Sequence, residues 1–291
     1  MRQPVEHSIK DILASKLLEI EKYLNSDVFV YYGSIVNGLE NTVLRIIEDL
    51  VADKKRKNIL TVILTTTGGS AYAVERYVNI FRKHYDEVNF IVPDYAFSAG
   101  TIFCMSGDKI FMDYFSVLGP IDPQVQNKEG KWVPALGYLD KINELVKKAQ
   151  DKTISDAEFI ILKEFDLAEL RGYEQAKELT ITLLKKWLVV YKFKNWDKHK
   201  SNPKLIGKDV SLKEKEARAE DIANKLSDNN IWKSHGRPIN IETLEKDLRL
   251  EIEDFSDDSE LRPLIRSYYE LLSDFIQKNK INIFVQTRKF I

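Results

Sequence analysis

The chain has 291 residues, of which 44% are hydrophobic, and its 44 Lys and Arg residues nearly balance 45 Asp and Glu residues, for a net charge of -1. No basic excess points to a nucleic-acid partner and no acidic excess points to disorder, so we expect an ordinary globular protein. The single cysteine, Cys104, excludes an internal disulfide. Because residues 1–10 lack a signal-peptide apolar region and no apolar stretch approaches the roughly 20 residues that span a bilayer, the predicted location is the cytoplasm.

The first half of the chain alternates between helical and strand patterns. Residues 8–25 have a helical period, and we expect residues 1–26 to form an N-terminal helix. Asn41 is predicted to cap a helix that reaches Lys54. Strands are predicted at 28–35, 60–64, 88–92, 109–112 and 116–118, and further helices at 71–84 and 98–105. Short β-branched strands that alternate with helices are typical of a buried parallel sheet with right-handed crossovers.

The second half of the chain is mostly helical in pattern. Helices are predicted at 139–150, 156–191, 211–226, 241–250 and 260–278, and a possible edge strand at 281–285. The lysine-rich residues 192–210 are expected to form an inserted surface loop. The predicted organisation is therefore an N-terminal helix over 1–26, followed by one α/β domain over 27–291 that carries this insertion.

The stretch from Thr65 to Gln124 holds the most informative residues. Gly68 and Gly69 follow one predicted strand, and Ser98 follows the next. In such units ligands bind at the carboxyl ends of the strands, so we expect these residues to face one crevice. A serine between small residues at a strand-to-helix turn is accessible, and the Ala99 N–H and a glycine amide are suited to hold an oxyanion. The alternative, that Ser98 only caps a helix and the glycines only form a turn, stays open at this point.

Three motifs occur in order: Thr-Thr-Thr-Gly-Gly-Ser at 65–70, Phe-Ser-Ala-Gly at 97–100 and Gly-Pro-Ile-Asp-Pro-Gln at 119–124. With Leu-Ala-Glu-Leu-Arg at 167–171 and Ser-His-Gly-Arg-Pro-Ile at 234–239, they resemble the serine dehydrogenase proteinase family of the Clp protease/crotonase superfold, related to signal peptide peptidase A. The resemblance covers about residues 27–275. It implies an α/β fold with a spiral β-α-β core and a helical C-terminal portion. It also implies Ser98 as the nucleophile and Gly68, Gly69 and Ala99 as the oxyanion and substrate-binding residues.

The general base is the part of the site on which the sequence departs from Clp protease. That family carries a histidine downstream of the serine, whereas the matching residues 119–122 contain none. His235 is the favoured candidate, because the matching turn in the superfold returns to the active site, and Asp122 is a candidate to orient it or to bind substrate. A lysine base, as in signal peptide peptidase A, is the competing arrangement, with Lys109 and Lys233 as candidates.

The predicted function is serine-type endopeptidase activity through an acyl-enzyme on Ser98, acting on a peptide or protein substrate. No Gly-x-Gly-x-x-Gly follows a predicted strand and no cluster has metal-ligand spacing, so we expect neither cofactor nor metal. Two rival functions stay open: a crotonase-like acyl-CoA enzyme, and a non-catalytic assembly protein that has lost its base. The resemblance also implies a homo-oligomer, with an expected interface on the helices after Leu139. Membrane-associated substrates and an unfoldase partner are left open.

Overall fold

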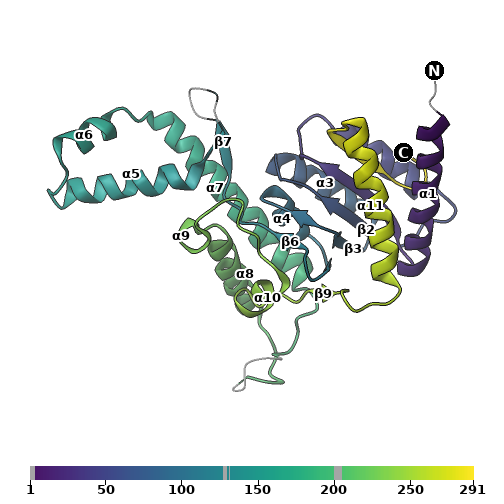
Figure 1. Ribbon diagram of the computed structural model, residues 1–291. Helices are drawn as coiled ribbons and strands as arrows, with labels where there is room; N and C mark the ends of the chain where they lie inside the picture. The colour runs from purple at the N-terminus through teal and green to yellow at the C-terminus, as the bar shows by residue number, and fades with distance from the viewer. Residues whose placement is uncertain (1–3, 127–129, 131, 200–204) are drawn as a thin grey trace.

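The computed structural model describes residues 4–126, 130, 132–199 and 205–291. Within these residues, six strands form the central sheet in the order β10-β1-β2-β3-β5-β9 (Figure 1). Their bounds are β1 Asp27–Gly33, β2 Ile59–Thr65, β3 Glu87–Val92, β5 Lys109–Met112, β9 Glu253–Asp254 and β10 Ile283–Gln286. Strands β1, β2, β3, β5 and β9 are parallel, and β10 pairs antiparallel with β1 at the edge of the sheet. The parallel core and the edge strand confirm the predicted topology.

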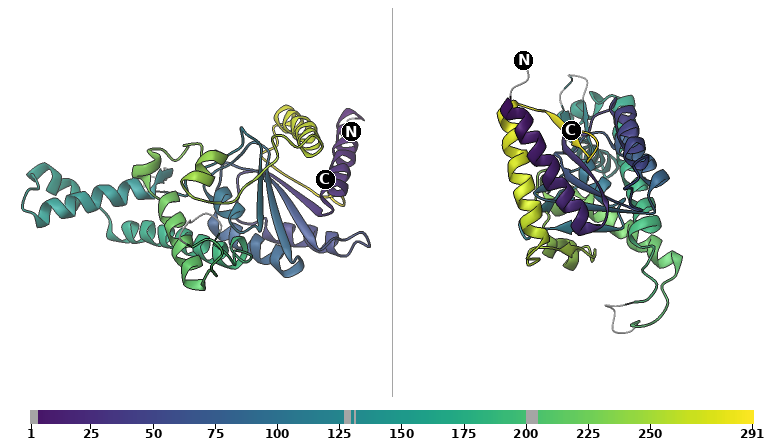
Figure 2. Two further views of the ribbon diagram at one scale, coloured as in Figure 1. Left: turned by 90° about the horizontal axis from the view of Figure 1, so that it is seen from below. Right: turned by 90° about the vertical axis from the view of Figure 1, so that its right-hand side faces the viewer.

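Helices cover both faces of the sheet, as Figure 2 shows. Alternate strand residues point to opposite faces, so Val28 and Val30 join one core cluster while Phe29 and Tyr31 join the other. Helices α1 (Pro4–Leu24) and α11 (Leu261–Asn279) pack in the first cluster. Helices α2 (Glu40–Val51), α3 (Ala71–His84) and α4 (Ala99–Cys104) pack in the second. The result is a three-layer α/β/α arrangement in which α1 contributes to the same core as the sheet.

Local signals in the first half of the chain predict most element ends well, with one incorrect cap. Helix α3 and strand β5 have the predicted bounds, and the Ser70 side chain caps α3 by accepting a hydrogen bond from the Ala73 N–H at 3.2 Å. The predicted Asn41 cap is wrong, because α2 begins at Glu40 and its N-cap residue, Leu39, makes no side-chain capping bond. The Glu40 carboxylate instead accepts a hydrogen bond from the Gly38 N–H at 2.8 Å.

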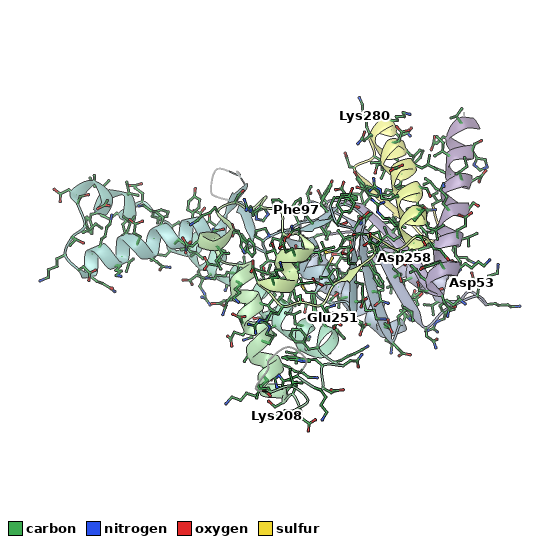
Figure 3. All side chains as sticks on the ribbon, turned by 60° about the horizontal axis from the view of Figure 1, so that its bottom comes forward. Asp53, Phe97, Lys208, Glu251, Asp258 and Lys280 are labelled. Carbon is green, nitrogen blue, oxygen red and sulfur yellow. The ribbon has the colours of Figure 1, made fainter. Side chains whose placement is uncertain are left out.

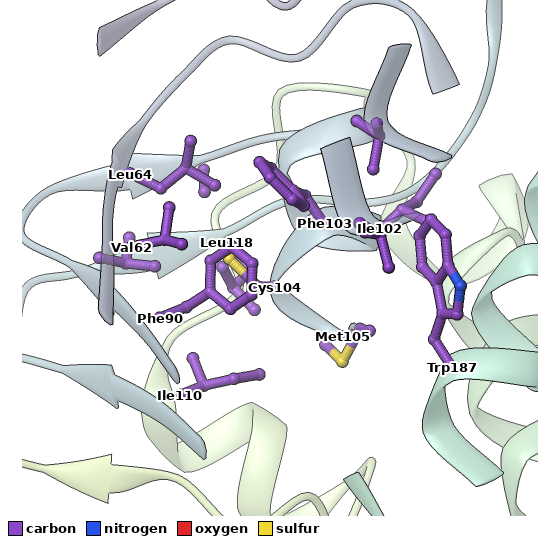
Figure 4. Packing of buried hydrophobic residues seen from close by; sticks show 14 of the residues in the cluster. Val62, Leu64, Phe90, Ile102, Phe103, Cys104, Met105, Ile110, Leu118 and Trp187 are labelled. Atoms are coloured by element: carbon purple, nitrogen blue, oxygen red, sulfur yellow. The ribbon is translucent and has the colours of Figure 1, made fainter. Parts of the chain in front are cut away.

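Helix α4, which begins directly after Ser98, is anchored in the larger core cluster (Figure 4). Its Phe103 ring lies 4.9 Å from the Phe90 ring of β3, in an edge-to-face arrangement. Cys104 is fully buried beside it, and burial raises the pKa of its thiol. Trp187, the last residue of α7 (Leu167–Trp187), lies in the same cluster. Close packing on both sides therefore holds the turn before α4 rigidly in place.

Three helices form an arm that projects from the sheet (Figure 1): α5 (Ala135–Gln150), α6 (Asp156–Lys163) and α7 (Leu167–Trp187). The predicted single helix over 156–191 is wrong, because the Asp166 side chain accepts hydrogen bonds from the Ala168 and Glu169 N–H groups and starts a new helix. A π-helix over Leu188–Lys192 then ends α7. Helix α6 buries no residue, and Phe159, Ile160 and Ile161 are 50%, 60% and 53% exposed. An interface on these helices stays a prediction.

The remaining elements surround the ends of the strands. Helices α8 (Leu212–Leu226), α9 (Asn229–Trp232) and α10 (Ile241–Lys246) pack near the base of the arm. Two small sheets pair β4 (Tyr95–Ala96) with β6 (Val117–Leu118), and β7 (Gln124–Gln126) with β8 (Trp132–Pro134). The predicted helix over 241–250 is too long, because Arg249 has a φ of 48° that no right-handed helix contains. Part of the lysine-rich segment, 200–204, lies outside the described residues.

Candidate active site

Ser98 occupies a backbone conformation that favours glycine. Its φ and ψ are 53° and -117°, and the Gly100 N–H donates to the Phe97 carbonyl at 2.8 Å. These angles and this bond define a type II′ turn with Ser98 at its second position. A non-glycine residue there costs about 1–3 kcal/mol, a strain that tends to occur at functional sites. Phe97, labelled in Figure 3, lies near the base of the arm.

The Ser98 side chain is not a helix cap. Ser98 stands at the N-cap position of α4, yet its side chain makes no capping hydrogen bond. The side chain is mostly buried, since the residue is 8% exposed. The alternative interpretation, a serine kept only to cap the helix, is therefore not what the structure contains.

The Gly68 turn packs directly against the Ser98 turn. A Cβ built on Gly68 would lie 2.8 Å from Ser98 Cβ, 2.9 Å from the Phe97 carbonyl oxygen and 3.3 Å from the Ala99 nitrogen. Gly68 also has a φ of +104°, in the region that favours glycine. The predicted meeting of Gly68 with Ser98 and Ala99 is thus present, and it leaves no room for a side chain at position 68.

Two backbone amides, those of Gly69 and Ala99, belong to the turns that meet here. The Gly68 carbonyl accepts from the Ile35 N–H at 2.8 Å, and the N–H of Gly69 belongs to the same peptide unit. Because C=O and N–H point in opposite directions across a trans peptide, the Gly69 N–H points away from Ile35, toward the side on which Thr66 pairs with Ala96. The Ala99 N–H starts α4, where the first amides have no partner within the helix. This arrangement has the donors that an oxyanion needs.

Two threonines that sequence reasoning missed hold the turns together. The Thr66 Oγ1 accepts from the Gly68 N–H at 3.0 Å, and its methyl group would clash with any Cβ on Gly100. The buried Thr101 hydroxyl accepts from the Gly119 N–H at 3.0 Å and lies 2.9 Å from the Ala96 carbonyl oxygen. The available signal was that Thr66 lies inside the motif at 65–70 and that Thr101 directly follows the motif at 97–100. Threonine in such a motif is hard to separate from ordinary strand and helix composition.

His235 lies in a segment that is joined to the Ser98 turn through one intervening strand. Ile239 pairs antiparallel with Leu118, with hydrogen bonds of 2.9 and 3.0 Å, and Leu118 pairs parallel with Ala96. The residues before Ile239 therefore run beside those after Leu118, on the side opposite Phe97 and Ser98. Burial lowers the pKa of His235 from its ordinary value. Among the described residues, its Nδ1 is buried without a hydrogen-bond partner.

Asp122 is buried at the beginning of the arm. It is 1% exposed, and its Oδ1 accepts from the Leu136 N–H of α5 at 3.2 Å. Its Oδ2 has no hydrogen-bond partner among the residues that the structure describes, so Oδ2 and the Nδ1 of His235 are not bonded to each other here. Burial raises the pKa of Asp122 to about 6, despite hydrogen bonds from Leu136 and Asn229 that oppose the shift. A role for Asp122 in orienting His235 stays a prediction.

Replacing Asp122 with asparagine is expected to stabilise the protein at neutral pH. The folded-state pKa of about 6 exceeds the ordinary 3.8, so the folded state holds a proton that the unfolded state has released between these values. The contribution of Asp122 to the free energy of unfolding therefore falls as the pH rises from about 4 to about 6. Asparagine keeps an acceptor for Leu136 and removes the buried charge, with an expected gain of up to about 3 kcal/mol above pH 6. Urea unfolding of the variant and the wild type at pH 4 and pH 7 measures this, and a difference in stability between them that does not grow with pH would contradict it.

The other candidate bases lie in different places. Lys109 begins β5, at the amino ends of the parallel strands, and its ammonium lies 3.8 Å from the Glu87 carboxylate. Ser98 follows the carboxyl end of β3, so Lys109 and Ser98 lie at opposite ends of the parallel strands. Lys233 is exposed and ends α9 in a left-handed conformation. His199 has a largely buried side chain that lies 3.2 Å from the Glu214 carboxylate.

The fold and this pair of turns define a class of protein, the α/β proteins of ClpP-like type. The chain belongs to the ClpP-like SDH-type serine proteinase family, whose sequence model matches residues 30–212. The predicted family and the predicted fold class are thus confirmed. The matched range includes Gly68, Gly69, Ser98, Ala99 and Asp122, and it ends before His235.

Similar proteins extend this comparison over part of the chain. Two relatives from Methanocaldococcus jannaschii, each described as an uncharacterized protein, are MJ0137 and MJ1495. MJ0137 is 33% identical over 148 residues, which cover 47% of this chain and 48% of the relative. MJ1495 is 32% identical over 128 residues, which cover 41% of this chain and 42% of the relative. The alignments thus span about half the length of these relatives or less. A lysine-to-alanine mutant of the 1510-N membrane-bound stomatin-specific protease, solved with a substrate peptide, is similar over 56% of this chain and 59% of its own, with a TM-score of 0.36 and 18% identity.

Two further properties of the described residues bear on partners. No helix among them combines the length and the apolar character needed to cross a membrane. In the same part of the chain, no group of three or more His, Cys, Asp or Glu residues could hold a metal ion.

Proposed function

We propose that the protein is a serine endopeptidase that hydrolyses peptide bonds through an acyl-enzyme on Ser98. The observation that carries this proposal is the conformation of Ser98. A serine whose side chain caps nothing occupies a strained type II′ position, and a side-chain-free Gly68 packs against it. This conformation costs backbone strain, and it is typical of a nucleophile presented at a sharp strand-to-helix turn.

The proposed reaction uses Ser98 and the amides of the two turns, together with a base that must reach the Ser98 hydroxyl. The Ser98 Oγ attacks the carbonyl carbon of the scissile peptide while the base takes its proton. The Gly69 and Ala99 N–H groups stabilise the resulting oxyanion, where one such donor is worth about 2.7–4 kcal/mol. The base then donates the proton to the leaving amine, and a water molecule hydrolyses the ester on Ser98 by the same two steps.

His235 is the proposed base and Asp122 the proposed group that orients it. Burial lowers the pKa of His235, so the imidazole is neutral at pH 7 and can accept a proton. Its buried Nδ1 and the buried Oδ2 of Asp122 both lack partners within the described residues, and hydrogen bonding between them would satisfy both. Their segments are joined by the pairing of Leu118 with Ile239.

A fluorophosphonate probe tests the proposal, because it phosphonylates an activated serine. We expect labelling of Ser98, located by peptide mass spectrometry. His235→Gln should slow labelling by about 10²-fold or more, because a general base contributes about that much, while Lys109→Gln should label like the wild type. The wild-type labelling rate should fall as the pH drops through the pKa of His235, which lies below 6.5.

The other outcomes separate the rival functions. A folded protein in which Ser98 resists the probe at every pH would contradict the peptidase proposal and favour an acyl-CoA enzyme or an assembly protein. Labelling that is unaffected by His235→Gln would support Ser98 as the nucleophile and contradict His235 as its base. A labelling rate that still rises between pH 8 and 10 would indicate a lysine base.

A further inference from the structure

A cavity of about 570 Å³ opens between α8, α9 and the residues that follow α10, apart from the Ser98 turn. Its described lining contains four cationic side chains (Arg218, Lys225, Lys246, Arg249), two carboxylates (Asp221, Asp247) and three apolar side chains (Ile231, Trp232, Leu248). The helices that form it stand near the base of the arm in Figure 1. Its volume lies within the range of about 300–1,000 Å³ typical of small-molecule sites.

The carboxylates of this cavity do not balance its cations. One oxygen atom, the Oδ2 of Asp221, pairs with both Arg218 at 2.8 Å and Lys225 at 3.1 Å. The Arg218 guanidinium also donates to the Leu248 carbonyl, which fixes its position without neutralising it. The cavity therefore carries an excess of positive charge in a protein whose net charge is -1.

Arg249 contributes the most available cation. Its guanidinium makes no hydrogen bond or ion pair with any residue that the structure describes. Its backbone has a φ of 48°. Its charge lies close to that of Arg218: burial lowers the pKa of Arg218, and repulsion from Arg249 adds to this, against the attraction of Asp221. Two arginines face one cavity, and only Arg218 of the two pairs with a carboxylate among the described residues, so an anion would stabilise this environment.

We propose that this cavity binds a small phosphate ester whose other end is apolar or aromatic, of the size of a nucleoside monophosphate. The guanidinium of Arg249 and the ammonium groups of Lys225 and Lys246 take the phosphate, since planar guanidinium groups match phosphate oxygens in pairs. The apolar wall formed by Ile231 and Trp232 takes the other end. A free phosphate would reach only the cationic side of a cavity of this volume.

Isothermal titration with AMP, adenosine and inorganic phosphate tests the proposal on the intact protein. We expect AMP to bind at least ten-fold more tightly than either adenosine or inorganic phosphate. Arg249→Gln should weaken AMP binding ten-fold or more, and Lys246→Gln, which changes an exposed residue paired with Glu242, should weaken it several-fold. Arg45→Gln is the matched control, because it removes the same charge from the exposed face of α2 and should leave binding unchanged.

Each alternative outcome overturns the proposal. No AMP binding at millimolar concentration would show that this basic cavity does not bind a phosphate ester of the proposed size. Equal binding of AMP and adenosine would show that the cavity does not recognise the phosphate. Equal binding of AMP and inorganic phosphate would show that the apolar wall does not contribute to binding. Unchanged AMP binding in both folded variants, Arg249→Gln and Lys246→Gln, would place the ligand elsewhere. None of these results bears on Ser98, so the peptidase proposal is tested separately.

Discussion

Replacing Ser98 with alanine is expected to reduce peptidase turnover by about 10⁴-fold or more while the protein stays folded. The expectation follows from the nucleophilic role, because no other group at the turn would form the acyl-enzyme. Ser98→Gly should be equally inactive, yet more stable than Ser98→Ala by about 1 kcal/mol, because glycine adopts a φ of 53° without strain. Hydrolysis of labelled casein measures turnover, and urea unfolding measures stability.

The two variants together separate a catalytic serine from a structural one. If Ser98 acted only as a helix cap, Ser98→Ala would cost stability, about 1 kcal/mol, and would leave turnover nearly intact. Turnover in the alanine variant within ten-fold of the wild type would therefore contradict the nucleophile assignment. A glycine variant less stable than the alanine variant would contradict the strained conformation of this turn.

Replacing Gly68 with alanine is expected to damage both stability and activity. The added methyl group would lie 2.8 Å from Ser98 Cβ and 2.9 Å from the Phe97 carbonyl oxygen, and the backbone would stay at a φ of +104°. Backbone strain and overpacking each cost about 1–3 kcal/mol, so we expect a total loss of about 3 kcal/mol. Because the Ser98 turn must move to make room, turnover should fall by about 10²-fold or more.

Gly38 offers a matched control for this substitution. Its φ is +98°, similar to that of Gly68, but a Cβ built on it meets no atom within 4 Å. Gly38→Ala therefore tests the backbone cost alone, with an expected loss of about 1 kcal/mol and little change in turnover. Equal losses of stability in the two variants, measured by urea unfolding, would show that the contact of Gly68 with the Ser98 turn has no energetic consequence.

Elements with strong local signals could be predicted from the sequence, and those made by distant pairing could not. Helix α3 has its predicted bounds because Ser70 caps it and its apolar residues recur at helical spacing. Strands β4 and β9, which were not predicted, have two residues each and exist only because they pair with distant segments. The equally short β6 lies within the strand predicted at 116–118. The break between α6 and α7 was missed because the helical period continues across the Asp166 cap.

Some features of the candidate site could also be predicted from the sequence, and others could not. Ser98, Gly68, Gly69 and Ala99 could be predicted because each follows a strand whose carboxyl end lies at one edge of a parallel sheet. The type II′ conformation of Ser98 could not be predicted, because it depends on the packing of α4 and on the contact with Gly68. The positions of Thr66 and Thr101 depend on hydrogen bonds between segments that only the folded chain brings together.

The sequence by itself determined the parallel α/β core, because that follows from apolar periodicity and short local turns. It also indicated the family, through the resemblance of its ordered motifs. Only the tertiary structure decided which groups meet. It packed Gly68 against Ser98 and placed Lys109 at the far end of the sheet. It also left Asp122 and His235 each with a buried atom that has no partner among the described residues. The physical reason is that such contacts depend on how strands and helices far apart in the chain pack together, and no local pattern records that packing.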